Sequence, residues 1–224
     1  MSLRSPKQYP VRPLLTSKYL TDAEPCSPLR RFAASVAAIS IVITPAAGFA
    51  NPVGGNVVAG QASIVDAGKN LDVNQLSNKA VIDWRGFDIA PDETTRFNQP
   101  NNNSLTVNRV NSNAPSIING KLSANGNLVV INQNGVLFGN QAKVDVNGII
   151  ATTADADNAS LMNDSKIKFT KAGKPDAAIV NQGSITAKEA GLVGFVAPNV
   201  ANCGIISARL GRVHLASGDT ATID

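Results

Sequence analysis

After about residue 50, the chain is a succession of short runs in which apolar residues recur at every second position. Such runs occupy residues 128–131, 136–138, 144–146 and 193–195, and asparagine or glycine bounds each of them. No stretch of 12 or more residues in this region has the i, i+3, i+4 apolar spacing of an amphipathic helix. The pattern therefore predicts an all-β protein built from short strands.

Three segments share one pattern, in which a glycine precedes aliphatic residues and a final alanine. They are residues 120–124, 183–187 and 204–208, and a glycine and an alternating strand follow each of them. The last two units begin at Asn181 and Asn202, which are 21 residues apart. We interpret the segment Asn147 to Ala151 as a fourth, partial copy. A fixed period of this length indicates stacked structural repeats.

This period suits a parallel β-helix, in which each coil of about 20 residues wraps once around an elongated core and stacks on the next. Equivalent residues then form ladders, so we expect Ile185 to lie beside Ile206 and Val193 beside Val213. The composition agrees, because the chain from Asn51 onward holds 24 asparagines and 17 glycines, which favour turns, and many β-branched residues. The alternative is an antiparallel sandwich with coincidental glycine spacing.

The first part of this β-region lacks the repeat. Residues 51–115 are expected to form a cap and the first coils, and residues 116–224 the repeating coils. A solenoid needs a cap because an open end exposes apolar core and unpaired strand edges. Residues 221–224 show no cap, which predicts a solenoid that continues into a longer exported chain.

Residues 80–89 alternate around a bulge that we expect near the glycine of this segment. The bulge would turn Ile82, Trp84, Phe87 and Ile89 to one face. Trp84 and Phe87 are therefore predicted to be structural residues of the cap rather than a platform for a ligand.

The first 50 residues have the order of an extended secretory signal peptide. Arg30 and Arg31 precede an uncharged apolar run of 12 residues, 32–43, and small residues follow up to Ala50. The run is too short to cross a bilayer, which needs about 20 apolar residues. A basic flank, an apolar segment and a small-residue cleavage site predict cleavage between Ala50 and Asn51. The alternative is a buried core helix.

The predicted leader carries the whole formal net charge of +4. It holds six Lys or Arg and two acidic residues, so the remaining 174 residues hold 14 of each sign. The region from Lys166 to Lys174 is its densest basic stretch and fits a solvated strand or loop edge. We therefore expect no nucleic-acid partner. Only Cys203 would remain after cleavage, so no disulfide is expected within the processed chain.

Residues with catalytic or metal-binding potential are sparse. His214 is the only histidine and is expected to face outward from an alternating strand. Asp155, Asp157 and Asn158 resemble part of a calcium loop but lack its central glycine and closing glutamate, so we expect a surface turn. No HExxH, GxSxG, P-loop or GxGxxG sequence occurs. We expect no enzyme activity, no cofactor and no bound metal.

An ordered series of short segments occurs at residues 81–89, 96–100, 107–110, 115–120, 123–126 and 130–139. This series resembles the N-terminal secretion domain of two-partner secretion exoproteins. That family comprises the filamentous-haemagglutinin-like adhesins, haemolysins and contact-dependent inhibition toxins of Gram-negative bacteria. The resemblance spans residues 51–224 and implies a right-handed parallel β-helix with an N-terminal cap.

The resemblance also implies partners and a recognition motif. In that family the Sec machinery delivers the chain to the periplasm, where the periplasmic domains of an Omp85-type outer-membrane transporter recognise the secretion domain. The family signature Asn-Pro-Asn-Gly-Ile corresponds to Asn132, Gln133, Asn134, Gly135 and Val136, with Gln133 in place of proline and Val136 in place of isoleucine. Asn134 and Gly135 are expected to form a tight turn with positive φ. The family's second signature, Asn-Pro-Asn-Leu, does not occur.

Three classes of function remain. The first is a secretion domain that leads an adhesin, haemolysin or toxin to the cell surface, where a downstream passenger would meet a host cell. The second is a stand-alone adhesive or carbohydrate-binding module, which would need a cluster of exposed aromatic residues. The third is a polysaccharide-lyase-like enzyme, which would need acids and bases aligned at coil spacing. Asp145, Asp176, Arg209 and Arg212 are not aligned in this way.

Overall fold

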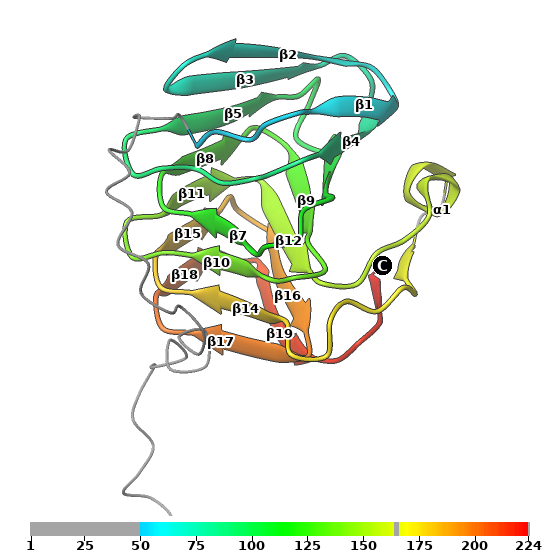
Figure 1. Cartoon of the computed structure of the whole chain (residues 1–224), viewed down its shortest axis with the longest axis vertical. Helices are drawn as coiled ribbons and strands as arrows, with labels where there is room; N and C mark the ends of the chain where they lie inside the picture. The colour runs from blue at the N-terminus through cyan, green and yellow to red at the C-terminus, as the bar shows by residue number, and fades with distance from the viewer. Residues whose placement is uncertain (1–49, 164–165, 224) are drawn as a thin grey trace, which may run out of the picture. The chain divides into compact units, whose positions relative to one another are not determined.

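A computed structural model describes residues 50–163 and 166–223, so residues 1–49 of the predicted leader lie outside the described residues. Within the described part, the chain forms 20 short strands and one six-residue helix, α1 (Asn158–Asn163). Figure 1 shows the strands stacked in successive coils along one axis. The predicted all-β class is confirmed.

Most strands belong to three sheets that run side by side along this axis. The first long sheet contains β1 (Asn56–Ala59), β4 (Lys79–Trp84), β6 (Leu105–Val110), β9 (Asn127–Ile131), β12 (Gly148–Thr152), β16 (Leu192–Ala197) and β19 (Arg212–Ser217). The second long sheet contains β2 (Ala62–Ala67), β3 (Asn70–Gln75), β5 (Thr94–Asn98), β8 (Lys121–Ala124), β11 (Lys143–Val146), β15 (Ser184–Ala187) and β18 (Ile205–Ala208). The short sheet contains β7 (Ser116–Ile118), β10 (Val136–Phe138), β14 (Ala178–Asn181) and β17 (Asn199–Asn202). A separate pair contains β13 (Ile167–Phe169) and β20 (Ala221–Ile223).

Strands from successive coils pair in parallel, as a β-helix requires. Ile185 pairs with Ile206 between β15 and β18, and Val193 pairs with Val213 between β16 and β19. Both predicted ladders are confirmed. The predicted right-handed parallel β-helix is confirmed with them, and the antiparallel sandwich is wrong.

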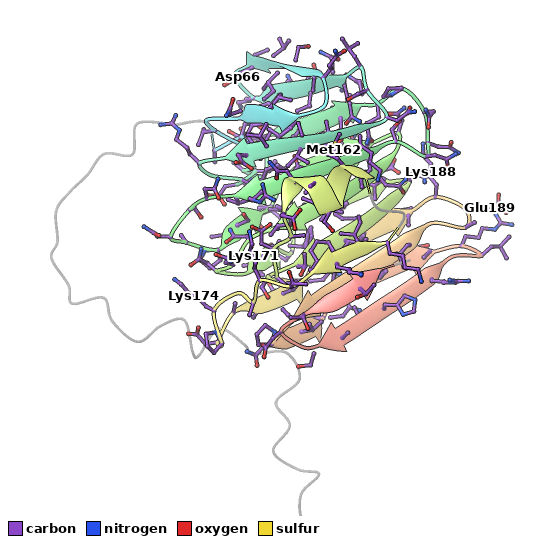
Figure 2. All side chains as sticks on the ribbon, turned by 90° about the vertical axis from the view of Figure 1, so that its right-hand side faces the viewer. Asp66, Met162, Lys171, Lys174, Lys188 and Glu189 are labelled. Carbon is purple, nitrogen blue, oxygen red and sulfur yellow. The ribbon has the colours of Figure 1, made fainter. Side chains whose placement is uncertain are left out.

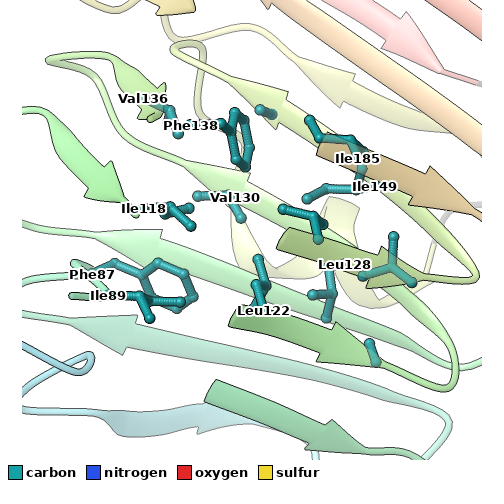
Figure 3. Close-up of a cluster of buried hydrophobic side chains, with 14 of the residues drawn as sticks. Phe87, Ile89, Ile118, Leu122, Leu128, Val130, Val136, Phe138, Ile149 and Ile185 are labelled. Carbon is teal, nitrogen blue, oxygen red and sulfur yellow. The ribbon is translucent and has the colours of Figure 1, made fainter. Parts of the chain in front are cut away.

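Side chains from all three sheets meet in one buried cluster inside the coils. Figure 3 shows Leu122 of β8, Leu128 of β9 and Phe138 of β10 in this cluster. Phe138 also stacks on Phe195 of β16, with ring centroids 5.7 Å apart. Burial of each such side chain stabilises the fold by about 1.5–3 kcal/mol, so the stacked coils supply the core that the sequence pattern requires.

The first long sheet is also buried on its outer face over β6, β9 and β12, whereas β19 is exposed. Residues 153–177 leave the coil between β12 and β14 and place α1 and β13 over this face, and Figure 2 shows α1 lying in front of the sheet. A second buried cluster forms there, with Val107 and Val129 from the sheet and Leu161 and Phe169 from the covering segment. Because both faces of β9 and β12 are covered, their sequences are continuous apolar runs, so the alternation described for residues 128–131 is wrong for β9.

At the N-terminal end the pairing changes to antiparallel, between β1 and β4 and between β2 and β3. Trp84 and Phe87 are each 1% exposed, and their rings meet edge to face at 5.7 Å. The indole Nε1 of Trp84 donates a hydrogen bond to Asn108 Oδ1 at 3.0 Å. Ile82 and Ile89 lie in the same interior cluster, so the common face expected for these four apolar residues is confirmed.

Residues 147–151 do not occupy the repeat position predicted for them. They form β12, which pairs with β9 and β16 in the first long sheet, whereas the coil equivalent of β15 is β11. The prediction was wrong because a glycine precedes strands of both long sheets, so the same sequence pattern occurs in two different positions of a coil. A Cβ at Gly204 would meet the carbonyl oxygen of Gly183, and a Cβ at Gly211 would meet that of Gly191.

The last described coil leaves apolar side chains exposed. Ile205 of β18 and Val213 and Leu215 of β19 are exposed, while β20 turns away from the coil and pairs antiparallel with β13. The continuation of the solenoid beyond residue 224 stays a prediction.

Candidate functional site

The five signature residues form a tight corner between β9 and β10. The carbonyl oxygen of Asn132 accepts a hydrogen bond from the Gly135 amide at 3.0 Å, which closes a four-residue turn. Gly135 has a φ of +114°, but Asn134 does not have positive φ, so that expectation is wrong for Asn134. Since neither central residue has positive φ, the turn is of type I, which favours asparagine first, proline second and glycine fourth.

The side chain of Asn132 is fully buried and joins this corner to the preceding coil. Its Oδ1 accepts a hydrogen bond from the Asn134 amide at 2.9 Å. Its Nδ2 donates to the carbonyl oxygen of Ala114 at 3.1 Å and to Ser116 Oγ at 3.0 Å. Ala114 lies just before β7, and Ser116 is its first residue. The side chain of Asn132 therefore connects the turn to the neighbouring coil.

The segment that precedes β14 packs against the other side of the corner. The Lys174 amide donates to the carbonyl oxygen of Gln133 at 2.9 Å, and Gln133 Nε2 donates to that of Ala172 at 3.4 Å. A Cβ at Gly135 would lie 2.5 Å from the carbonyl oxygen of Ala178. The turn is therefore held between the coils on both sides, and its glycine is required for close approach as well as for φ.

Burial divides the signature into two parts. Asn132 and Val136 are 0% and 1% exposed, and Gly135 is buried, whereas Gln133 is exposed and Asn134 is half-buried. In the folded domain another protein can touch only Gln133 and part of Asn134. A partner that reads all five residues must therefore meet the chain before this coil has folded.

Sequence reasoning missed a cluster of polar contacts around Arg109 in β6. Its Nε lies 2.9 Å from Asp155 Oδ1, and its Nη1 lies 3.1 Å from Asp83 Oδ1 and 2.8 Å from Asn158 Oδ1. Its Nη2 donates to the carbonyl oxygen of Ala156 at 2.7 Å. Burial alone would lower the pKa of Arg109. The two aspartates have the larger combined effect, because their hydrogen bonds and negative charges raise this pKa above its usual value. This cluster attaches the covering segment to the coils.

Asp155 and Asp157 therefore have structural roles. The side chain of Asp155 is 15% exposed because Arg109 covers it, so the expected surface turn is wrong for this residue. Asp157 Oδ1 accepts a hydrogen bond from the Ser160 amide at 2.8 Å and caps the start of α1. Within residues 50–163 and 166–223, no group of three or more His, Cys, Asp or Glu is placed to hold a metal ion.

The other residues singled out from the sequence are dispersed. His214 is exposed on β19, as expected. At the predicted cleavage site, Ala50 is half-buried and Asn51 is buried. Cys203 is disulfide-bonded, and the expectation that no disulfide forms within the processed chain stays a prediction. No helix in the described part is long and apolar enough to cross a membrane.

The described part of the chain defines the class to which the protein belongs by fold, a parallel β-helix with antiparallel strands at its N-terminal end. Comparison with known proteins identifies its family. The family model of the TPS secretion domain, the domain of two-partner secretion exoproteins, matches residues 49–224. The chain belongs to this family.

Relatives and a solved structure agree with that assignment. A heme/hemopexin-binding protein of Haemophilus influenzae (strain ATCC 51907 / DSM 11121 / KW20 / Rd) is 36% identical over 174 residues, which are 75% of this chain and 19% of the relative. A second Haemophilus influenzae protein of that name is 38% identical over 113 residues, which are 50% of this chain and 12% of the relative. The crystal structure of the HMW1 secretion domain from Haemophilus influenzae gives a TM-score of 0.69 at 35% identity and covers 75% of this chain and 45% of that one.

The family sets the function at a general level. The chain is a secretion domain of an exoprotein, and such exoproteins are secreted through the periplasm of Gram-negative bacteria with a partner transporter. The family is not known for enzyme activity. The chain spans about a fifth or less of the length of the curated relatives that it matches.

Proposed function

We propose that the Sec machinery exports this chain, that its leader is removed between Ala50 and Asn51, and that residues 51–224 then engage an Omp85-type outer-membrane transporter. The transporter's periplasmic domains recognise the signature Asn132 to Val136 in the unfolded chain. The domain then starts translocation and folds at the cell surface ahead of an adhesin, haemolysin or toxin passenger.

The burial of the signature is the observation that carries this proposal. Three of its five residues are inaccessible once β9 and β10 are in place, and Asn132 is fully enclosed. A periplasmic partner therefore reads the whole signature only in an unfolded chain. The same chain can be threaded through a pore, and folding at the far side then hides the signature from the transporter.

The coil architecture supplies a physical reason for this order of events. Each coil pairs with its immediate neighbours, as β11 pairs with β8 and β15, so a coil can fold before the next one has left the pore. Every added coil buries apolar surface and opposes return of the chain. No nucleotide is needed for this step.

The experiment compares two buried corner asparagines. Asn132 and Asn181 are both 0% exposed, and each holds a corner through its side-chain amide, but only Asn132 lies in the signature. Asn132→Ala and Asn181→Ala are exported with the partner transporter, and the fraction of each chain in the culture medium is measured. We expect secretion to fall strongly for Asn132→Ala and to stay near the wild-type level for Asn181→Ala.

The exposed position Gln133 provides a further comparison. Gln133→Ala leaves the buried corner contacts in place, so any loss of secretion in this variant reports on recognition rather than on folding. Normal secretion of Asn132→Ala, or equal losses for Asn132→Ala and Asn181→Ala, would show that the signature is not a recognition element.

A further inference from the structure

Glu93 is a buried carboxylate at the N-terminal end of the β-helix. Glu93 is 3% exposed. It is the last residue of a turn in which its backbone amide donates a hydrogen bond to the Ala90 carbonyl oxygen at 2.9 Å. The carboxylate accepts two backbone hydrogen bonds, from the Ala50 amide at 2.6 Å and from the Ala90 amide at 2.8 Å. The first of these donors belongs to the residue that precedes the predicted mature N-terminus.

The carboxylate has no side-chain counter-charge at close range. Among the described residues, no lysine or arginine forms an ion pair with Glu93. Lys69 attracts Glu93 from beyond ion-pair distance, but its ammonium group lies 2.6 Å from Asp92 and is exposed to solvent. A carboxylate that only neutral amide groups contact would gain from a cation at the same place, because a hydrogen bond from a charged donor is the stronger one.

The side chain of Asn51 is fixed by hydrogen bonds, and the backbone nitrogen of this residue is the atom that would become a cation after cleavage. Asn51 is 2% exposed, its Nδ2 donates to the Gly68 carbonyl oxygen at 2.7 Å, and its Oδ1 accepts from Thr95 Oγ1 at 3.1 Å. Thr95 is itself fully buried. The Asn51 nitrogen lies one residue from the Ala50 nitrogen that already contacts Glu93, and consecutive Cα atoms are about 3.8 Å apart.

We propose that Glu93 forms a binding site for an α-ammonium group and that its occupant is the N-terminus of Asn51 in the processed chain. Hydrolysis of the Ala50–Asn51 peptide bond leaves the carboxylate on Ala50 and an amine on Asn51. That amine is mostly protonated at neutral pH, since the ordinary pKa of an α-amino group is about 7.7–8.0. The occupant depends on the cleavage position proposed above.

This site couples removal of the leader to stability of the cap. Before cleavage, the chain offers Glu93 only a neutral amide from residue 50. After cleavage, it offers a full positive charge with three N–H donors, which is the stronger partner for a carboxylate. Capture of a terminal amine by a folded surface is a known mode of peptide recognition, and here donor and acceptor belong to the same chain.

The test uses the processed protein. The full chain is exported, its first residue is determined by intact mass, and the α-amine is converted to a ketone by selective N-terminal transamination, which leaves the lysines unchanged. Urea unfolding is then measured with and without this conversion in wild type, in Glu93→Gln and in Asp92→Asn. We expect conversion to raise the unfolding equilibrium constant about tenfold or more in wild type and Asp92→Asn, and less than about twofold in Glu93→Gln.

A second readout does not need a folded Glu93→Gln chain. The rate at which an amine reagent labels the α-amine at pH 7 should be at least about tenfold lower in folded wild type and Asp92→Asn than in the same chains in urea, because a buried ion pair protects the amine. Equal labelling rates, or equal effects of transamination in wild type and Glu93→Gln, would overturn the site. A first residue other than Asn51 would also overturn it, while secretion through the partner transporter would be unaffected.

Discussion

At the residue scale, the signature turn shows which features of the structure can be predicted from the local sequence and which depend on contacts with other coils. Asparagine and glycine at its first and fourth positions predict a turn, because the type I geometry favours each of them there. The contacts of Asn132 with Ala114 and Ser116 could not be predicted, because they depend on how the preceding coil stacks. The contact of Glu93 with the Ala50 amide could not be predicted either, because these residues are 43 positions apart in the sequence.

Replacement of Gln133 by proline should stabilise the domain. Gln133 occupies the second position of the type I turn, where proline is favoured, and no hydrogen bond from its amide occurs among the described residues. Fixing φ in advance lowers the entropy of the unfolded chain, so we expect Gln133→Pro to raise the free energy of unfolding by about 0.4–1 kcal/mol. Urea unfolding measures this change, and a lower midpoint than wild type would contradict the turn assignment.

Asp88 should make stability depend on pH. Burial raises its pKa above the ordinary 3.8, although the hydrogen bond from the Ile117 amide lowers it. Because the native state holds this proton more tightly than the unfolded state, the contribution of Asp88 to stability is fully present below pH 3.8 and is lost as pH rises through the native pKa. Asp88→Asn cannot ionise and still offers an acceptor to Ile117.

We therefore expect the stability of Asp88→Asn relative to wild type to increase as pH rises above 3.8 and then to level off. Urea unfolding of both proteins over a series of pH values gives this difference. Parallel stability curves across the whole range would show that Asp88 is not perturbed by burial.

At the element scale, the covering segment is the feature that sequence patterns described least well. The short repeating strands were predictable because each coil repeats the same alternation. The docking of α1 and β13 was not, because it depends on Arg109 meeting Asp155 from a position 46 residues away. The misplaced fourth copy at residues 147–151 has a related cause, since a glycine before a strand marks a coil corner without indicating which sheet follows.

Arg109→Lys should loosen this segment selectively. A lysine has one ammonium group and cannot reproduce the planar set of donors that contacts Asp83, Asp155, Asn158 and the Ala156 carbonyl oxygen. We expect a loss of about 1–3 kcal/mol and faster amide hydrogen exchange in α1 and β13, with strands β8 to β12 still protected.

The control is another arginine that pairs with an aspartate on the protein surface. Arg96 lies 3.6 Å from Asp72, and both side chains are substantially exposed, so Arg96→Lys should change stability by less than about 0.5 kcal/mol. Equal effects of the two substitutions, or uniform loss of protection across the β-helix in Arg109→Lys, would contradict a local role for the Arg109 cluster.

At the scale of the whole molecule, the fold and the function have one physical origin. Coils that pair only with their neighbours form a core that can be built one coil at a time. Within this core, equivalent residues of successive coils lie side by side, as Ile185 does with Ile206 and Val193 with Val213. Parallel stacking extends into the region without a visible repeat, where β3 pairs with β5 and β4 with β6. The repeat was hidden there because the antiparallel end strands β1 and β2 interrupt the succession of parallel coils.

The same scale explains why the leader and the β-helix carry separate information. The predicted leader holds the whole net charge, while the region behind it has balanced charge and contains the buried segment that we propose as the recognition signature. In the proposed function, the first segment directs one crossing by its charge and hydrophobicity, and the second directs another by a sequence that is buried once the coil has folded.

The most direct test measures binding of residues 51–224 to the immobilised periplasmic domains of the partner transporter, with a panel of sugars as the alternative ligand. The chain is added both folded and by dilution from urea. Retention by the transporter domains, stronger for the chain diluted from urea and lost in Asn132→Ala, with no retention on the sugars, is the predicted result. Binding to a sugar without binding to the transporter domains in either state would contradict it.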